Sequence, residues 1–310
     1  MSDRKRPSDP PREVDPGGVF LPPSPLFHRQ ECPVSLKELI DREIGKHPHN
    51  EPLLKAFRPV WEERERLLVR GLEALDNLPV PDILRLNAGM PVMKQIETPL
   101  PEGTCRKVAL ALISFLKEGF PTLERDLDRL ESGLQEGTLS FSSLGQGTDP
   151  VPAERLLCRQ VERVILEGMA MRLEGLWEKV TWFRGYCPVC GSFPSLAIIG
   201  EKVGERILHC SRCGHHWRFS RIVCPCCEQE SPEGMTFFRI EGSEQEAAFT
   251  CDTCRRYLVT LHRVSDTFER DGDVCALGLF HLDIVMQQKG FQPMTDTDWN
   301  GIGGEGPQGG

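Results

Sequence analysis

The chain has 310 residues, which is enough for one large domain or for two to three modest ones. Its composition is 27% charged and 39% hydrophobic, and its formal net charge is −9. A chain this acidic is poorly suited to non-specific nucleic-acid binding, which requires a basic surface.

No segment predicts export or membrane insertion. The first residues are charged and proline-rich, without the apolar stretch of a signal peptide. The longest apolar stretch, residues 108–116, is too short to span a bilayer. Thirteen cysteines in such a chain indicate a reducing compartment, where thiols bind metal or stay free. We therefore expect a soluble, cytoplasmic protein.

The first half of the chain predicts a helical domain. Apolar residues at helical spacing cover residues 36–44, 53–75, 104–117, 123–134 and 153–179. Ser35 and Glu38 form a capping-box pattern at the first helix, whereas Pro59 is expected to break or kink the second. Proline-rich residues 78–101 and polar residues 138–152 predict connections between helices.

The second half changes to short β-like runs, at residues 196–199, 206–209, 217–223, 236–240 and 257–262. Two related modules follow each other here, each with the order knuckle, hairpin, knuckle, strand. A helix is expected after them, over residues 274–289.

The predicted fold class is therefore α+β: an N-terminal all-α domain, two tandem rubredoxin-like or zinc-ribbon metal modules, and a C-terminal helix. The expected boundaries are a disordered arm 1–33, a helical domain 34–184, a first module 185–222, a second module 223–272, a C-terminal helix 273–296 and a disordered tail 297–310.

Eight cysteines form four CxxC pairs, and the pairs form two successive sets. The first set is Cys187, Cys190, Cys210 and Cys213, and the second set is Cys224, Cys227, Cys251 and Cys254. A CxxC turn directs two sulfurs toward one point, and two such turns complete the tetrahedron that Zn²⁺ or a rubredoxin-type iron prefers. The spacing predicts two metal ions, one per set, and does not choose between iron and zinc.

The two sets differ in the residues around them. Gly191 and Gly214 follow the second cysteine of each pair in the first set, where a knuckle uses a left-handed turn. Glu228 and Arg255 stand at those positions in the second set. The second set also contains Cys226, an alternative ligand or a free thiol. We expect the second metal to be held more loosely or to be more exposed.

Metals that only stabilise small ribbons are the simplest interpretation, because modules this small bury little core. A redox iron or a reactive thiol at Cys226 is the sharper alternative. His209, His215 and His216 lie next to ligands in the sequence, where surface or supporting roles are expected. Cys105 and Cys158 are expected in the helical core, and Trp217 and Phe219 in the core of the ribbon.

The sequence carries no GxSxG, P-loop or GxGxxG motif in a strand–helix context, so we do not expect an enzyme. Two other functions stay open. A zinc ribbon can bind nucleic acid, but residues 187–262 hold eight Lys or Arg against nine Asp or Glu. A rubredoxin-like iron can transfer electrons.

Residues 186–259 resemble the FdhE family of formate dehydrogenase accessory proteins. The motifs that carry the resemblance are CPVCGS at 187–192, GERILHCSRC at 204–213, Trp217, RIVC at 221–224 with Cys227, and CDTC at 251–254 followed by Tyr257 and Leu258. Residues 276–290 are similar to the helix that follows the metal modules in that family. Cys226 and the pair His215–His216 depart from the pattern.

The resemblance implies a cytoplasmic assembly factor with rubredoxin-like metal sites. Its partner would be the catalytic subunit of a molybdenum- or tungsten-dependent formate dehydrogenase, contacted during maturation. The eight paired cysteines would be the positions that bind iron and that matter for this contact. The acidic charge argues against a nucleic-acid partner, and the short apolar stretches argue against membrane insertion. The oligomeric state stays unknown.

Overall fold

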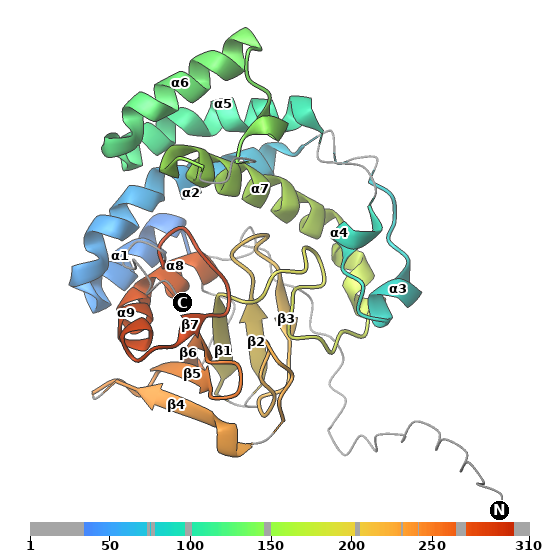
Figure 1. Cartoon of the computed structure of the whole chain (residues 1–310), viewed down its shortest axis with the longest axis vertical. Coiled ribbons are helices and arrows are strands. Elements are labelled where there is room, and N and C mark those ends of the chain that lie inside the picture. The colour runs from blue at the N-terminus through green and yellow to red at the C-terminus, as the bar shows by residue number, and fades with distance from the viewer. Residues whose placement is uncertain are drawn as a thin grey trace, which may run out of the picture.

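The computed structural model describes residues 34–300, except residues 73–74, 76–77, 97–100, 146–149, 202–204, 231, 241 and 265–270. The expected disordered arm 1–33 and residues 301–310 of the expected tail lie outside this part of the chain. The fold is α+β, with a helical N-terminal half, two tandem four-cysteine ribbon modules and C-terminal helices (Figure 1).

Seven α-helices precede the ribbon modules in the described residues. They are α1 (Leu36–Lys46), α2 (Glu51–Arg70), α3 (Ile83–Asn87), α4 (Val92–Gln95), α5 (Glu102–Gly119), α6 (Glu124–Glu136) and α7 (Pro152–Arg172). Short 3-10 turns extend or join them, notably η2 (Pro48–Asn50) and η6 (Glu174–Lys179). The helical periodicity therefore predicted the long helices, with ends displaced by a few residues.

The start of α1 follows the predicted capping box. The Ser35 Oγ accepts a hydrogen bond from the Glu38 amide at 3.2 Å, and the Ser35 amide donates to the Glu38 carboxylate at 3.0 Å. Pro59, by contrast, does not break α2, which runs from Glu51 to Arg70. The neighbouring Phe57, Val60 and Trp61 are fully buried. Their tertiary packing therefore stabilises the helix although Pro59 lacks the amide that would donate a helical hydrogen bond.

The predicted connection 78–101 contains the two short helices α3 and α4, which local composition did not reveal. The Asp82 side chain caps α3 by accepting from the Leu84 amide at 2.8 Å. The predicted helix 153–179 ends as α7 at Arg172 and continues as the 3-10 turn η6. None of the described helices combines the length and the apolar character needed to cross a bilayer.

The ribbon modules form one mixed sheet. Its strands are β1 (Leu196–Gly200), β2 (Arg206–His209), β3 (His216–Arg218), β4 (Met235–Arg239), β5 (Glu246–Cys251), β6 (Arg256–Val264) and β7 (Gln292–Pro293). The order is β3-β2-β1-β6-β5-β4, and β7 pairs with β6. The predicted order of knuckle, hairpin, knuckle and strand is confirmed in both modules, although β5 was not among the predicted runs and β3 is shorter than predicted.

A parallel pair joins the two modules. Ala197 of β1 lies opposite Thr260 of β6, and Ile198 lies opposite Leu261. Each module contributes an antiparallel hairpin. The parallel pairing of β1 with β6 joins the two modules, so the sheet is continuous from one four-cysteine set to the other. The buried apolar residues of the helices and of the sheet also form one continuous cluster. The ribbon modules thus share one hydrophobic core with the helical half.

The C-terminal segment differs from the prediction in two ways. The single helix expected over residues 274–289 is divided into α8 (Gly272–Gly278) and α9 (Phe280–Gln288). Trp299, expected in a disordered tail, is 4% exposed and lies 5.9 Å from Phe57 between ring centroids. The tail expectation is therefore wrong for residues 297–300, because an indole buried against α2 offsets the cost of ordering them.

Candidate metal centres

The structure brings together both predicted cysteine sets. In the first cluster, Sγ–Sγ distances are 3.4 Å for Cys187–Cys213 and 3.5 Å for Cys190–Cys210. In the second cluster, the distance from Cys224 to Cys254 is 3.8 Å, and that from Cys227 to Cys251 is 3.7 Å. Four sulfurs about 2.3 Å from one ion in a tetrahedron lie about 3.8 Å apart. Both clusters therefore have the dimensions of a four-thiolate metal centre.

The knuckle backbone explains how the sulfurs converge. The Gly191 amide donates to the Cys187 carbonyl at 2.9 Å, and the Gly214 amide donates to the Cys210 carbonyl at 2.8 Å. Both glycines have the predicted left-handed conformation, with φ of 79° and 72°. Glu228 and Arg255 take the same conformation, each with φ of 56°. The second cluster therefore uses the same turns but holds non-glycine residues in a backbone region that costs L-residues about 1–2 kcal/mol.

The first cluster is buried beneath the helical half. Its four cysteines are at most 7% exposed. Helix α4 contacts its first knuckle, because the Val92 and Met93 amides donate to the Pro188 and Val189 carbonyls at 2.9 and 3.0 Å. These bonds satisfy knuckle carbonyls that have no strand partner. The short helix in the proline-rich connection thus positions the metal-binding turn.

Arg163 of α7 supports the other knuckle of the first cluster. Its Nη1 donates to the carbonyls of Cys210 and Ser211 at 3.0 and 3.2 Å. A Cβ on Gly214 would lie 2.8 Å from Arg163 Nη2, so glycine is needed there for space as well as for conformation. A guanidinium beside the sulfurs also offsets the negative charge that four thiolates with a divalent ion carry.

A buried network of charges extends from Arg163 to α8. Asp273 accepts from Arg64 at 2.9 Å, from Arg163 at 3.2 Å and from His209 at 2.8 Å. Its side chain is 3% exposed. Burial opposes the charge, but Arg163 and Arg64 hold the pKa of Asp273 well below its usual range. The network links α2, α7 and β2, so it fixes the first cluster relative to the helices.

The pKa values of three first-cluster thiols are shifted by burial and by hydrogen bonds between the thiols. Burial raises the pKa of Cys187 and of Cys213, whereas hydrogen bonds from neighbouring thiols lower the pKa of Cys190. A metal ion replaces the shared protons, since a coordinating thiol is deprotonated outright. The donor set thus fits zinc or iron, and the geometry favours neither.

The second cluster is more accessible, as expected. Cys227 is exposed and Cys254 is partly exposed, whereas Cys224 and Cys251 are buried. Cys227, not Cys226, completes the group of four sulfurs. Cys226 is partly buried against the apolar cluster, and burial raises its pKa. That environment disfavours a reactive thiolate at Cys226.

The three neighbouring histidines stay outside both sulfur clusters. His209 bonds to Asp273, and its Nδ1 lies 3.1 Å from His216 Nε2. His215 is buried, with its ring 4.6 Å from that of Trp177. These contacts match the supporting role expected of them. Trp217 is buried and Phe219 packs against the core, also as predicted.

The remaining predicted core cysteines lie in the helical half. Cys105 is buried and Cys158 partly buried, and burial raises their pKa values to about 11 and about 12. Sequence reasoning did not single out the group of His47, His49 and His281, whose nitrogens come together between α1 and α9. Because His281 is at least 232 positions from His47 and His49, no local motif could have revealed the group.

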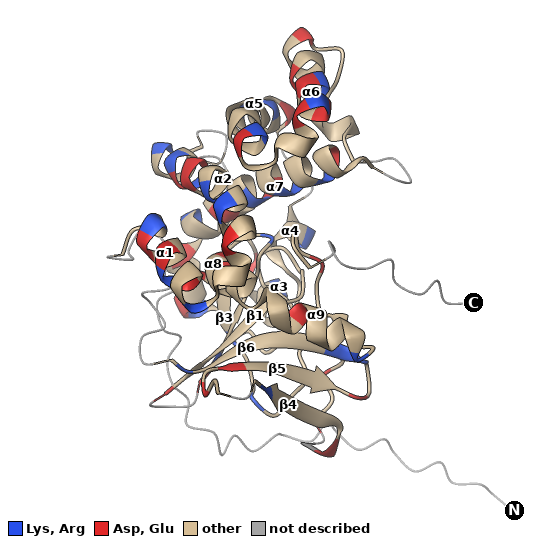
Figure 2. Cartoon of the chain, turned by 90° about the vertical axis from the view of Figure 1, so that its left-hand side faces the viewer, with Lys and Arg blue, Asp and Glu red and all other residues tan. Residues whose placement is uncertain are grey.

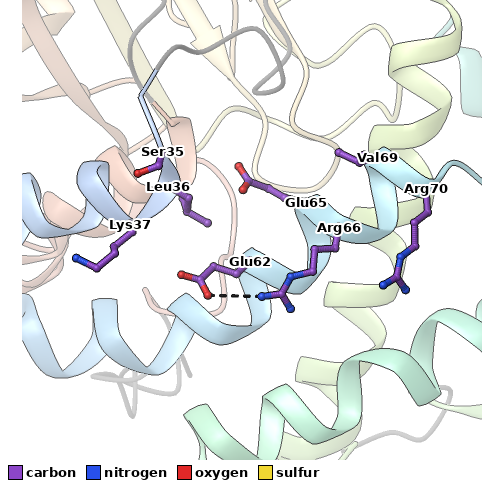
Figure 3. Close-up of a pocket in the computed structure, with 8 residues that line it drawn as sticks. All are labelled: Ser35, Leu36, Lys37, Glu62, Glu65, Arg66, Val69 and Arg70. Atoms are coloured by element: carbon purple, nitrogen blue, oxygen red, sulfur yellow. Dashed lines mark ion pairs between the residues drawn. The ribbon is translucent and has the colours of Figure 1, made fainter.

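A surface groove lies between the start of α1 and the end of α2 (Figure 3). Its lining residues are Ser35, Leu36, Lys37, Glu62, Glu65, Arg66, Val69 and Arg70. Glu62 and Arg66, one turn apart on α2, form an ion pair of 3.9 Å along one side of it. The groove contains no cysteine or histidine, so it offers no metal chemistry.

The chain is similar to known proteins in this region. Residues 186–221 match the family described as FdhE, central domain. Protein FdhE of Salmonella arizonae is 32% identical over 191 residues, which cover 59% of this chain and 56% of that protein. Over these segments the chain is similar to FdhE proteins. Protein FdhE of Escherichia coli O9:H4 is 39% identical over 113 residues, or 35% of each chain.

The matched segments therefore span about a third to just over half of the length of these FdhE relatives. The crystal structure of the FdhE protein from Pseudomonas aeruginosa has a TM-score of 0.58 to this chain, with 23% identity. That comparison covers 90% of this chain and all of the other, so the fold is shared well beyond the cysteine modules.

Proposed function

We propose that the chain is a non-enzymatic, cytoplasmic assembly or maturation factor for a molybdenum- or tungsten-dependent formate dehydrogenase, and that it binds the catalytic subunit. One observation carries this proposal. The FdhE central-domain match, residues 186–221, coincides with the first four-cysteine cluster and its strands. The resemblance to FdhE proteins is the reason for naming a formate dehydrogenase as the partner. The cysteine clusters would provide the metal chemistry that such a factor uses.

Each cluster would hold one metal ion, either iron or zinc. The ligands would be Cys187, Cys190, Cys210 and Cys213 in the first site, and Cys224, Cys227, Cys251 and Cys254 in the second. Iron in four thiolates adds one-electron redox chemistry, whereas zinc only cross-links. The chain itself supplies the knuckle amides, the guanidinium of Arg163 and the burial of the first site.

The two metal sites would have different roles. The first, buried and fixed by Arg163, would stabilise the junction between the helices and the sheet. The second, with Cys227 exposed, would be the one accessible to the catalytic subunit or to an oxidant. Its non-glycine knuckle residues, Glu228 and Arg255, cost backbone energy, which is compatible with a site kept for function.

A nucleic-acid-binding ribbon is less well supported, because ribbon arginines are already paired. Arg212 pairs with Glu162 at 3.2 Å, Arg218 pairs with Glu205, and Arg206 is 3% exposed. Figure 2 shows Lys and Arg interspersed with Asp and Glu along α1, α2 and α6, while most of the sheet is uncharged. Binding to nucleic-acid phosphates requires a contiguous basic surface instead of mixed charges.

Anaerobic co-purification tests the proposal. A tagged full-length chain should retain the catalytic subunit of the formate dehydrogenase, and the double substitution Cys224→Ser/Cys227→Ser should reduce the retained amount at least tenfold. The matched control is Cys158→Ser, which removes a thiol outside both clusters and should retain the subunit fully. Failure of the unmodified chain to associate under anaerobic conditions contradicts the maturation role. Full retention by the double variant contradicts the role of the second site alone.

A further inference from the structure

Three histidines from two distant segments share one small volume outside the cysteine clusters. His47 caps the end of α1, His49 lies in η2, and His281 lies in α9. One ring nitrogen from each lies within 4.8 Å of the other two. The ring centroids of His47 and His281 are 4.9 Å apart, and His49 is 5.5 Å from His281.

A carboxylate from the sheet lies beside two of these histidines. Glu246, the first residue of β5, has one oxygen 2.8 Å from His47 Nε2 and the other 3.7 Å from His281 Nε2. Glu43 of α1 also lies 3.5 Å from His47 Nε2, but Lys46 pairs with it at 3.0 Å. Glu246 is therefore the carboxylate that faces two of the three imidazoles.

The surrounding fold holds these side chains in place. The Asn50 side chain donates to the Gly278 carbonyl at 2.7 Å, which ties η2 to the end of α8. Gly278 is itself required by the packing, because a Cβ there would lie 2.4 Å from Glu43 Oε1. Pro48 starts η2 with a backbone angle suited to that turn. Buried packing thus fixes the backbone of η2 against the end of α8.

A single hydrogen-bonded pair does not explain this arrangement. His47 and Glu246 alone would satisfy each other at 2.8 Å. One ring nitrogen of His49 and one of His281 nevertheless lie within 4.8 Å of a nitrogen of His47, although histidines that gain charge repel one another. Three imidazoles and a carboxylate form a donor set that divalent transition metals, zinc above all, take in proteins.

We propose that His47, His49 and His281, together with Glu246, form a third metal site that binds a divalent transition ion such as Zn²⁺. Two nitrogens on one tetrahedral zinc lie about 3.3 Å apart. The histidine nitrogens must therefore move closer together, and the hydrogen-bonded Glu246 and His47 must move slightly apart. The exposed His49 and the partly exposed His281 have room for the required side-chain rotation.

The ion would connect the two halves of the molecule. Its ligands come from the first helices, from strand β5 of the second module and from α9, and α9 lies against β5 (Figure 1). Binding would join the helical half to the sheet through three histidines that are distant in sequence from every cysteine ligand. This site is independent of the formate dehydrogenase proposal, since it needs no partner protein.

Zinc titration of the full chain tests the inference. The cysteine clusters are first loaded with zinc, the excess is removed, and Zn²⁺ is titrated calorimetrically. One further equivalent should bind. His49→Ala, at an exposed position that leaves the core intact, should weaken this step at least tenfold, and His281→Ala should do the same. The matched control Lys37→Ala, which removes an exposed ammonium paired with Asp41 on α1, should bind like the unmodified chain.

Cobalt provides a second measurement. Co²⁺ added to the zinc-loaded chain should give visible absorption without the near-ultraviolet charge-transfer band of a cobalt–thiolate bond. The absence of a further equivalent of Zn²⁺ would overturn the inference. So would undiminished binding by both His49→Ala and His281→Ala, or a thiolate band at the added cobalt, which would assign the uptake to Cys226 or another thiol.

Discussion

The buried carboxylate of Asp273 should be the strongest single electrostatic contribution to stability among the contacts described above. Its oxygens accept from Arg64, Arg163 and His209 over 2.8–3.2 Å, and its side chain is 3% exposed. Asp273→Asn keeps the shape but removes the negative charge. Two guanidiniums then stay buried without their shared partner, although Glu167 still lies 3.0 Å from Arg163 and 3.8 Å from Arg64.

Breaking such a buried network by removing one partner costs about 3–5 kcal/mol. Urea unfolding of the metal-loaded chain, followed by tryptophan fluorescence, measures the change, provided that the denaturant slope stays constant. The matched control is Asp252→Asn, which removes an exposed carboxylate 3.7 Å from Arg255 and should cost less than about 1 kcal/mol. If Asp273→Asn costs no more than this control, the network does not join the helices to the ribbon as described.

The other predictions concern pH, the knuckles and metal release. Burial raises the pKa of Asp283 to about 7, so between about pH 4 and pH 7 the folded chain binds more protons than the unfolded chain and stability falls as pH rises. Asp283→Asn should remove this fall, which amounts to at most about 4 kcal/mol; an unchanged melting temperature profile from pH 4 to pH 8 contradicts the assignment. Gly191→Ala should destabilise the chain by about 1–2 kcal/mol, whereas Glu228→Gly should stabilise it by up to about 1 kcal/mol; urea midpoints that move in the same direction for both refute the left-handed-turn argument. A chelator should remove the metal of the exposed second cluster first, so Cys227→Ser should abolish the fast phase of release and Cys187→Ser the slow one; a single phase in the unmodified chain speaks against two unequal sites.

Local chemistry made the knuckles predictable from the sequence. The two cysteines of each pair are three residues apart, and Gly191 and Gly214 mark the left-handed turn directly after two of the pairs. The capping box at Ser35 and the helical periodicity are equally local. The structure agrees with these predictions because the interactions that decide them lie within a few residues of one another.

Long-range contacts explain what the sequence did not reveal. Scattered acidic residues were expected on solvated helix faces, yet Asp273 is buried against Arg64, which is 209 residues away. No local pattern separates such a carboxylate from an exposed one. The parallel pairing of β1 with β6, the burial of Trp299 and the continuity of α2 through Pro59 also depend on partners distant in the chain. Tertiary packing overrode local propensity at each of these points.

The central claim is that this chain carries two four-thiolate metal centres of unequal exposure. Metal analysis of the anaerobically purified full chain, combined with its absorption spectrum, tests it most directly. We predict two thiolate-bound ions per chain, with one lost in Cys187→Ser/Cys190→Ser and the other lost in Cys224→Ser/Cys227→Ser. Ferric tetrathiolate absorbs in the visible and zinc does not, so the same spectrum assigns the metal. Fewer than two thiolate-bound ions in the unmodified chain, or an unchanged content in either double variant, would contradict the claim.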